Sequence, residues 1–163
     1  MKTILQTILV VTFLVGSVLA QADNLPRFED YPAGKGFTGK PAPAIIAHPR
    51  ARLFRTMIKT QAQKGPNFAG HYTVATWGCG SGCRGFAIID ARTGRVYFNP
   101  KALNVMTPPY LDEDTLQFRP DSRLFIVSGA VDGLNGYQDE AKFYYEWKNN
   151  RFKLIRKIKR DES

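Results

Sequence analysis

The chain has 163 residues, two of them cysteines, and a formal net charge of +9 at pH 7. A chain of this length forms one domain and buries a core without a framework of disulfides, so a disulfide-rich miniprotein and, on length, a closed propeller are excluded. The positive charge favours an anionic partner, but the interleaved aromatic residues of a single-stranded nucleic-acid binder are missing, and nucleic acid is not an expected partner.

The first 20 residues have the three-part pattern of a secretory signal peptide. Met1 and Lys2 supply a positive start, an uncharged apolar run extends from Ile4 to Val15, and small residues precede Ala20. The alternative is an uncleaved membrane anchor, but the run is shorter than the roughly 20 residues that span a bilayer. No later segment is apolar enough to cross a membrane. We therefore predict cleavage after Ala20 and a periplasmic or secreted protein without a transmembrane segment.

The next two segments predict an arm and a helix. Residues 21–48 are rich in proline and glycine, which cannot sustain a helix, so an extended arm over the surface is expected. Over residues 49–64, apolar side chains fall on one stripe, Pro49 suits a first helical turn, and Gly65–Pro66 ends the helix. Because the basic residues of this segment lie largely off the stripe, the helix is expected to pack on a sheet with its basic side outward.

After Pro66 the sequence alternates with a period of two, as half-buried strands do. Seven strands are predicted, over residues 71–77, 86–90, 95–98, 115–118, 124–128, 142–147 and 151–158. A type I turn closed by a left-handed Gly94 joins the second strand to the third, and Asn149–Asn150 forms a two-residue primed turn in the last hairpin. Prolines between positions 100 and 109, and glycines between 129 and 139, predict two loops.

These elements predict a single α+β domain over residues 49–163, preceded by the signal peptide (1–20) and the arm (21–48). Its architecture is an antiparallel sheet of about seven strands covered on one face by the N-terminal amphipathic helix. The alternative is a small all-β sandwich or an open barrel with a peripheral helix.

The most distinctive segment is that of residues 77–83, Trp-Gly-Cys-Gly-Ser-Gly-Cys, which contains both cysteines. In an oxidising compartment, Cys79 and Cys83 are expected to form a structural disulfide that contributes about 2 kcal/mol. A redox-active pair is one alternative, although such pairs generally have two intervening residues at a helix N-terminus. A zinc site with His71 and His48 is another, but their spacing does not support it, and no metal is predicted.

Three stretches together resemble a known family. They are Gly-Pro-Asn-Phe-Ala-Gly-His-Tyr at residues 65–72, the cysteine segment at 77–83, and Asp90-x-x-Thr93-Gly94. The family consists of small exported bacterial proteins with no assigned activity. The resemblance covers about a third of the mature chain. It therefore implies export but no catalytic residues.

Candidate binding residues surround the cysteine loop. Gly80 and Gly82 permit positive φ angles, so that backbone N–H groups can converge on an anion. Trp77 and Arg84 flank the loop and add an aromatic ring and a cation. His71 shares a strand face with Trp77. The alternatives are a tight hairpin that needs glycine only in order to turn, and a histidine with a structural role.

No nucleophile elbow, phosphate loop or dinucleotide fingerprint is present, so no catalytic residue and no cofactor is predicted. The first hypothesis is a non-enzymatic binding or inhibitor-like protein of the periplasm or cell envelope, with an unknown partner such as an envelope protein. The second is an enzyme that uses Cys79 and Cys83 for thiol–disulfide exchange or His71 for hydrolysis. The third is electrostatic attachment to an anionic envelope polymer through the basic segments 50–64 and 148–160.

Overall fold

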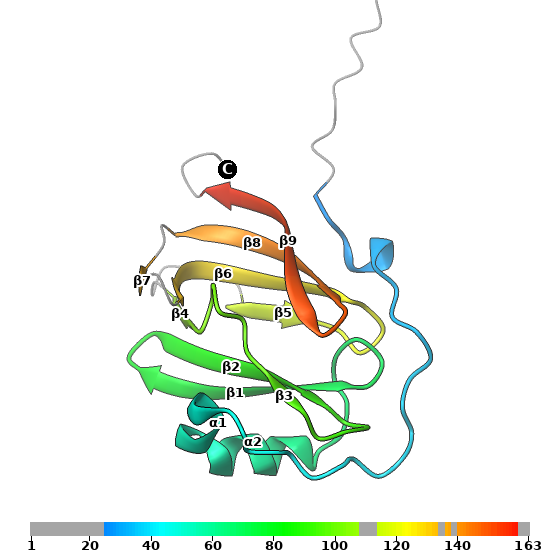
Figure 1. Cartoon of the computed structure of the whole chain (residues 1–163). Helices are drawn as coiled ribbons and strands as arrows, with labels where there is room; N and C mark the ends of the chain where they lie inside the picture. Colours follow the sequence, from blue (N-terminus) through cyan, green and yellow to red (C-terminus); the bar gives the residue numbers. More distant parts are fainter. Residues whose placement is uncertain (1–24, 108–113, 134–135, 138–139, 160–163) are drawn as a thin grey trace, which may run out of the picture.

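A computed structural model describes residues 25–107, 114–133, 136–137 and 140–159 (Figure 1). The predicted signal peptide lies outside the described residues. The helical elements are a 3-10 turn η1 (Phe28–Asp30) and the helices α1 (Pro49–Leu53) and α2 (Arg55–Ala62). The strands are β1 (Tyr72–Gly80), β2 (Cys83–Asp90), β3 (Val96–Tyr97), β4 (Asn104–Met106), β5 (Leu116–Phe118), β6 (Leu124–Gly133), β7 (Gly136–Tyr137), β8 (Ala141–Lys148) and β9 (Arg151–Lys159).

The strands form one antiparallel sheet whose main path runs β1-β2-β4-β6-β8-β9. Strand β6 pairs with β8 as far as Gly129, and its residues 130–132 pair with β4. Strand β4 also pairs with the start of β2. It therefore connects two layers, one made of β1, β2 and β3 and the other of β5, β6, β8 and β9 (Figure 1). The sheet thus curls into two layers, and it does not close into a barrel because β1 and β9 remain at its two ends.

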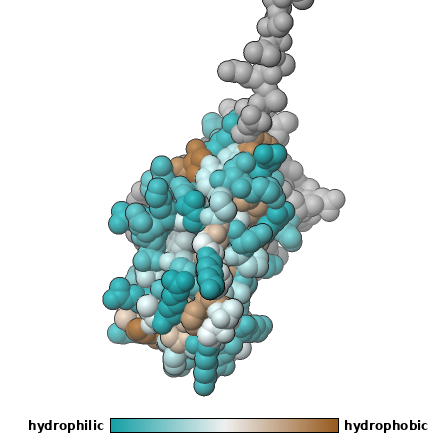
Figure 2. All heavy atoms as spheres, turned by 90° about the vertical axis from the view of Figure 1, so that its right-hand side faces the viewer, coloured by the Kyte–Doolittle hydropathy of each residue, from teal (hydrophilic) through white to brown (hydrophobic). Residues whose placement is uncertain are grey.

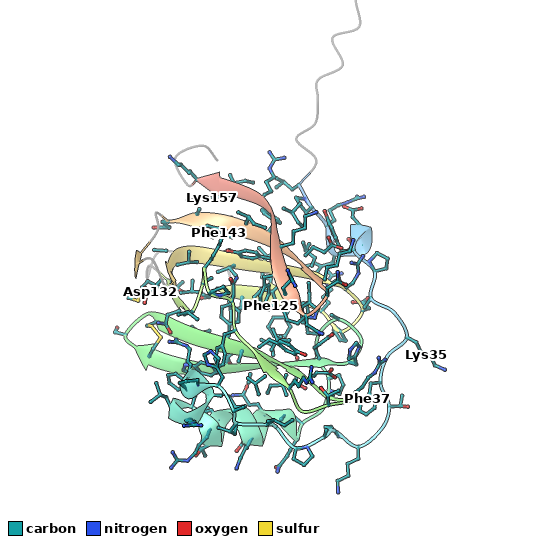
Figure 3. The ribbon with its side chains drawn as sticks, viewed as in Figure 1. Lys35, Phe37, Phe125, Asp132, Phe143 and Lys157 are labelled. Atoms are coloured by element: carbon teal, nitrogen blue, oxygen red, sulfur yellow. A yellow bond between two sulfur atoms is a disulfide. The ribbon has the colours of Figure 1, made fainter. Side chains whose placement is uncertain are left out.

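The main core fills the space between the two layers. Phe125 of β6 lies near the centre of this space (Figure 3). Its ring stacks with that of Phe86 on β2 at 5.2 Å and with that of Phe118 on β5 at 5.5 Å, measured between ring centroids. Burial of a phenylalanine side chain stabilises a fold by roughly 1.5–3 kcal/mol, so these rings fasten the layers together.

Both outer faces of the curled sheet are covered as well. On the lower layer, Ala75, Ala87 and Ile89 pack against the helices. On the upper layer, Tyr144 packs against side chains of the N-terminal arm. The arm is also fixed by backbone hydrogen bonds, among them Ala33 N to Asp121 O, Ala42 N to Ala91 O and Ile45 N to Gly94 O. The predicted extended arm is therefore present over residues 25–48 and serves as a cover for two separate faces.

The exposed edge of β1 is capped by two side-chain amides. Gln61 of α2 donates to the carbonyl oxygen of Thr76 at 2.6 Å and accepts from its N–H at 3.0 Å. Asn67 likewise accepts from the N–H of Val74 at 2.7 Å. Unpaired strand edges invite pairing with other chains, and these amides occupy part of that edge. They also fix the helix layer against the sheet.

The predicted helix of residues 49–64 is interrupted. Phe54 leaves the helical conformation, with φ −113° and ψ 23°, and separates α1 from α2. Its ring stacks on Trp77 of β1, with 4.3 Å between the ring centroids. Arg50 of α1 donates to the carbonyl oxygen of Leu103 at 3.3 Å. The predicted apolar stripe is confirmed only in part, because Ile58 and Ala62 are buried whereas Leu53 and Met57 are exposed.

The predicted class is confirmed at the level of a largely antiparallel sheet with small helices. All seven predicted strands are present, and both predicted turns are confirmed by the positive φ of Gly94, Asn149 and Asn150. The two predicted loops are corrected, because β4 lies in the first and the end of β6 and β7 in the second. The prolines flank β4 without entering it. Gly129 lets β6 approach β4 so closely that a Cβ atom would lie 2.4 Å from the Met106 oxygen.

Candidate functional site

Trp77 belongs to the core and not to a binding surface, which corrects the sequence-based expectation. Its side chain is only 5% exposed, and its ring lies between β1 and the helices. The cross-strand partner of Trp77 is Gly85, where a Cβ atom would lie 2.2 Å from the indole Nε1. Glycine at this position therefore makes room for the ring. The predicted presentation of Trp77 to a partner does not occur in this conformation.

Arg84 lies on the opposite face of β2 from Gly85, because successive side chains of a strand point to opposite faces. It is exposed and lines a small hollow together with Thr76, Thr115 and Leu116. Since Trp77 shares the face of Gly85, the sheet separates the indole from the guanidinium. The two residues that were predicted to act together thus do not form a common site.

The cysteine loop is the tip of the β1–β2 hairpin. Cys79 and Cys83 form a disulfide with 5.0 Å between their Cα atoms, as predicted. Gly80 and Gly82 have φ angles of 132° and 66°, which the tight turn requires. The carbonyl oxygen of Gly82 accepts from the N–H of Thr107 at 2.7 Å. Among the described residues, no group of three histidine, cysteine, aspartate or glutamate side chains is placed to hold a metal ion.

His71 lies at the other end of β1 from this loop. Eight residues of extended chain place it roughly 25 Å from Cys79. The histidine and the disulfide therefore do not combine into one site. His71 is half-buried and lines a hollow with Tyr72 and Arg92. The predicted site residues are thus distributed over the core, the hairpin tip and the far end of the strand.

A large cleft lies in a place that none of these predictions located. Its volume is about 880 Å³. It opens between helix α1, strand β3 with the segment 98–103 that follows, and the start of β9. Its apolar lining includes Leu53, Val96, Tyr97, Phe98, Leu103 and Phe152. Clefts of about 300–1,000 Å³ lined mainly by apolar side chains are typical of small-molecule sites.

The charged side chains around this cleft are basic. Arg50, Lys101 and Arg151 line it, and no acidic side chain of the described residues does. Arg50 is half-buried, and burial lowers its pKa from the ordinary value, while Asp132 opposes this shift. Its Nη2 donates to Asn104 Oδ1 at 2.6 Å. The guanidinium is therefore held in place at the wall, while Lys101 and Arg151 are exposed at the rim.

Local hydrogen bonds fix the shape of the cleft. His48 caps α1, because its Nδ1 accepts from the N–H of Arg50 at 3.1 Å. Asn99 is buried, and its Oδ1 accepts from the N–H of Lys101 at 3.0 Å, which turns the segment after β3. On the opposite wall, the hydroxyl of Tyr72 donates to Asn150 Oδ1 at 2.6 Å and holds the β8–β9 turn. The cleft is thus preformed by three separate segments.

Sequence reasoning missed the cleft because its walls are far apart along the chain. The one usable signal was the presence of two basic segments, 50–64 and 148–160. Arg50 belongs to the first and Arg151 to the second, and the fold brings both to the same cleft. Their meeting depends on how the sheet curls, which no local pattern specifies.

No family model, curated protein or solved structure matches this chain. The resemblance to small exported bacterial proteins therefore stays a hypothesis, and the geometry of the sites is the basis for any function. Among the described residues, no helix has the length and apolar character needed to span a membrane.

Proposed function

We propose that this is a non-enzymatic binding protein of the periplasm or cell envelope, and that its apolar cleft holds a ligand with an elongated apolar body and one acidic group. The single observation behind the proposal is the combination of an apolar lining with a wholly basic set of charged side chains. The apolar body would lie against Phe98, Val96 and Phe152. The acidic group would lie at the rim, beside Arg151 and Lys101.

The physical argument rests on two separate contributions. Removing apolar surface from water contributes about 25 cal/mol per Å², and the cleft offers this along its lining. A charge-assisted hydrogen bond to a carboxylate contributes more than a neutral one and selects an acid over an alcohol of the same length. Binding of this kind needs neither a catalytic residue nor a cofactor.

The location outside the cytoplasm is supported by the signal-peptide pattern of residues 1–20 and by the disulfide. Disulfides persist in oxidising compartments and are rare in the cytosol. The two enzyme hypotheses, thiol–disulfide exchange at Cys79 and Cys83 or hydrolysis by His71, stay separate alternatives to this proposal. Export and ligand binding together describe a carrier or a sensor of amphipathic acids.

The proposal is tested by titrating the purified protein with laurate and with dodecanol, followed by calorimetry below their aggregation concentrations. We expect laurate to bind at least about tenfold more tightly, since only the acid can form a charge-assisted hydrogen bond at the rim. Replacement of Arg151 by glutamine should remove most of this difference. Equal affinity of laurate and dodecanol, or no binding of either, contradicts the proposal.

A matched pair of variants tests the position of the ligand. Leu53 lines the cleft and is 77% exposed, and Met57 lies on the neighbouring helix, is 44% exposed and does not line the cleft. Because both side chains are largely exposed, aspartate at either position should leave the fold intact. Leu53→Asp should weaken laurate binding by about tenfold or more, through loss of apolar contact and charge repulsion, and Met57→Asp should not. Equal effects of the two variants would place the ligand elsewhere.

A further inference from the structure

A second hollow lies on the other side of the β8–β9 turn from the cleft. Its volume is about 410 Å³, and its wall includes His71, Tyr72, Arg92, Trp147 and Lys148. None of these residues lines the cleft. Hydrophilic residues cover most of the side of the molecule shown in Figure 2, which is the right-hand side of Figure 1. The hollow is therefore separate from the cleft, and its lining combines basic side chains with the aromatic rings of Tyr72 and Trp147.

The charged groups that line this hollow are basic. They are Lys35, Arg92, Arg123 and Lys148. Arg123 is neutralised by a salt bridge with Glu146. Within the described part of the chain, the other three form no salt bridge. Lys35 extends from the arm away from the body of the protein, at the rim (Figure 3). Arg92 and Lys148 are thus the two cations of the hollow that can contact an anion. His71, which directly precedes β1, lines the same hollow and is a third group that can do so.

Among the described residues, the carboxylate whose charge acts on His71 is that of Asp90. Asp90 is buried, and its Oδ1 accepts from the backbone N–H of Arg92 at 2.8 Å. The pKa of His71 is lowered from its ordinary value, first because the ring is partly buried and then because Arg92 repels the proton, while Asp90 opposes the shift. Both effects favour the neutral form of the imidazole.

Backbone hydrogen bonds hold one part of the wall of the hollow, at Ala69 and Gly70. Ala69 has a positive φ of 45°, which is costly for a residue with a Cβ atom. Such a backbone conformation persists only when surrounding bonds hold it. The N–H of Ala69 donates to the carbonyl oxygen of Arg119, and the next N–H, of Gly70, donates to Pro120. The ring of His71, which follows, lies 4.1 Å from that of Tyr72. A strained turn beside a hollow is typical of a preorganised binding site.

We propose that this hollow binds a doubly charged oxyanion, such as the phosphate group of a small soluble ester, between Arg92, Lys148 and His71. Coulomb attraction grows with the charge of the anion, so these cations stabilise a doubly charged anion more strongly than a singly charged one. The hollow is larger than a phosphate group, so it leaves room for the body of the ester beside Tyr72. This site is independent of the apolar cleft and of the ligand proposed there.

The first test is calorimetric titration with glycerol 3-phosphate, using a matched pair of arginine variants. Arg92 lines the hollow, whereas Arg95 is exposed in the same β2–β3 turn and does not line it. We expect Arg92→Gln to weaken binding by about tenfold, the loss of one charge-assisted hydrogen bond, and Arg95→Gln to leave it unchanged. Equal effects of the two variants, or no effect of Arg92→Gln, would overturn the proposal. Laurate binding to the cleft should be the same in all three proteins, which separates this result from the test of the cleft.

The second test uses the proton on His71 as the readout. Sulfate keeps its charge between pH 5 and 8, so any change in its affinity over this range belongs to the protein. Because protonation of His71 adds a positive charge, sulfate should bind more tightly as the pH falls below 6.5, and bound sulfate should raise the pKa of His71, measured by NMR titration of the imidazole. His71→Asn should remove the pH dependence but keep binding at pH 7.5. A His71 pKa that is unchanged by saturating sulfate would overturn the proposal.

A final comparison distinguishes a soluble phosphate ester from a lipid headgroup with the same chemistry. Vesicles of phosphatidylcholine with phosphatidic acid are compared with glycerol 3-phosphate, and each is tested with the wild-type protein and Arg92→Gln. Loss of glycerol 3-phosphate binding in the variant supports the soluble ligand. Vesicle binding that depends on Arg92, without binding of glycerol 3-phosphate, overturns it in favour of a membrane headgroup.

Discussion

The pair of Trp77 and Gly85 shows how a single residue without a side chain determines the packing of a large one. The indole is enclosed by Phe54 on the helix side and by the backbone of Gly85 on the neighbouring strand. Within the described residues its Nε1 has no hydrogen-bond partner. The ring therefore contributes through apolar burial and stacking, and its position depends on the space at Gly85.

Replacement of Gly85 by alanine is expected to lower the free energy of unfolding by about 1–3 kcal/mol, the usual cost of overpacking. The new Cβ atom would lie 2.2 Å from Nε1 and 2.7 Å from Cε2 of a buried ring, which has no free direction in which to move. Gly78 is the matched control, because it is exposed on β1 and a Cβ atom there meets nothing within 4 Å. Chemical denaturation of both variants measures the difference, and equal stability of the two would disprove this account of Trp77.

At the level of elements, the β8–β9 turn is a wall shared by two sites. Asn150 and the two residues that follow it line the apolar cleft, while Lys148 and Asn149 line the basic hollow. Both central residues have left-handed φ angles, 52° and 58°, as a type I′ turn requires. The hydrogen bond from the Tyr72 hydroxyl to Asn150 Oδ1 connects this turn to the start of β1.

This hydrogen bond predicts non-additive effects on stability. Tyr72→Phe and Asn150→Gly should each remove it, and the loss of one such bond lowers the free energy of unfolding by about 1 kcal/mol. The double variant should therefore be less destabilised than the sum of the two single variants, by about the same amount. Asn149→Gly, which keeps the bond and suits the left-handed conformation, serves as the control. Strict additivity in denaturation experiments would show that the bond contributes nothing.

Local sequence patterns predicted the elements more completely than their connections. Alternation assigned the residues of β8 to its two faces correctly, because successive side chains of a strand point to opposite faces. The expectation of half-buried strands was wrong for β1 and β8, since both of their faces are covered. Alternation could not predict β4, a strand of three residues whose pairing partners on β2 and β6 lie far away along the chain. The break at Phe54 was hidden for the same reason, since its cause is Trp77 on another element.

At the scale of the whole molecule, the curl of the sheet brings together what the sequence keeps apart. The described parts of the basic segments 50–64 and 148–160 belong to the helix layer and to the far end of the sheet, and they meet around the apolar cleft, through Arg50 and Arg151. Charge counting indicated an anionic partner, but not that apolar side chains would accompany the charges. The cleft could not be predicted because it forms only in the complete fold. The disulfide could be predicted because its two cysteines are only four positions apart in the sequence.

The disulfide provides the test at this scale, because it lies at the hairpin tip and no residue between 78 and 84 lines the cleft. Replacement of Cys79 and Cys83 together by serine should lower the free energy of unfolding by about 2 kcal/mol, the entropy of closing so short a loop in the unfolded chain. Laurate affinity should stay within about twofold of the wild-type value, since stability and binding are separate while the protein remains folded. Denaturation with and without a reducing agent, and calorimetry on the folded variant, measure the two quantities. Loss of laurate binding in a folded serine variant would show that the hairpin tip belongs to the binding site, because a purely structural bridge affects the population of folded protein and not its affinity.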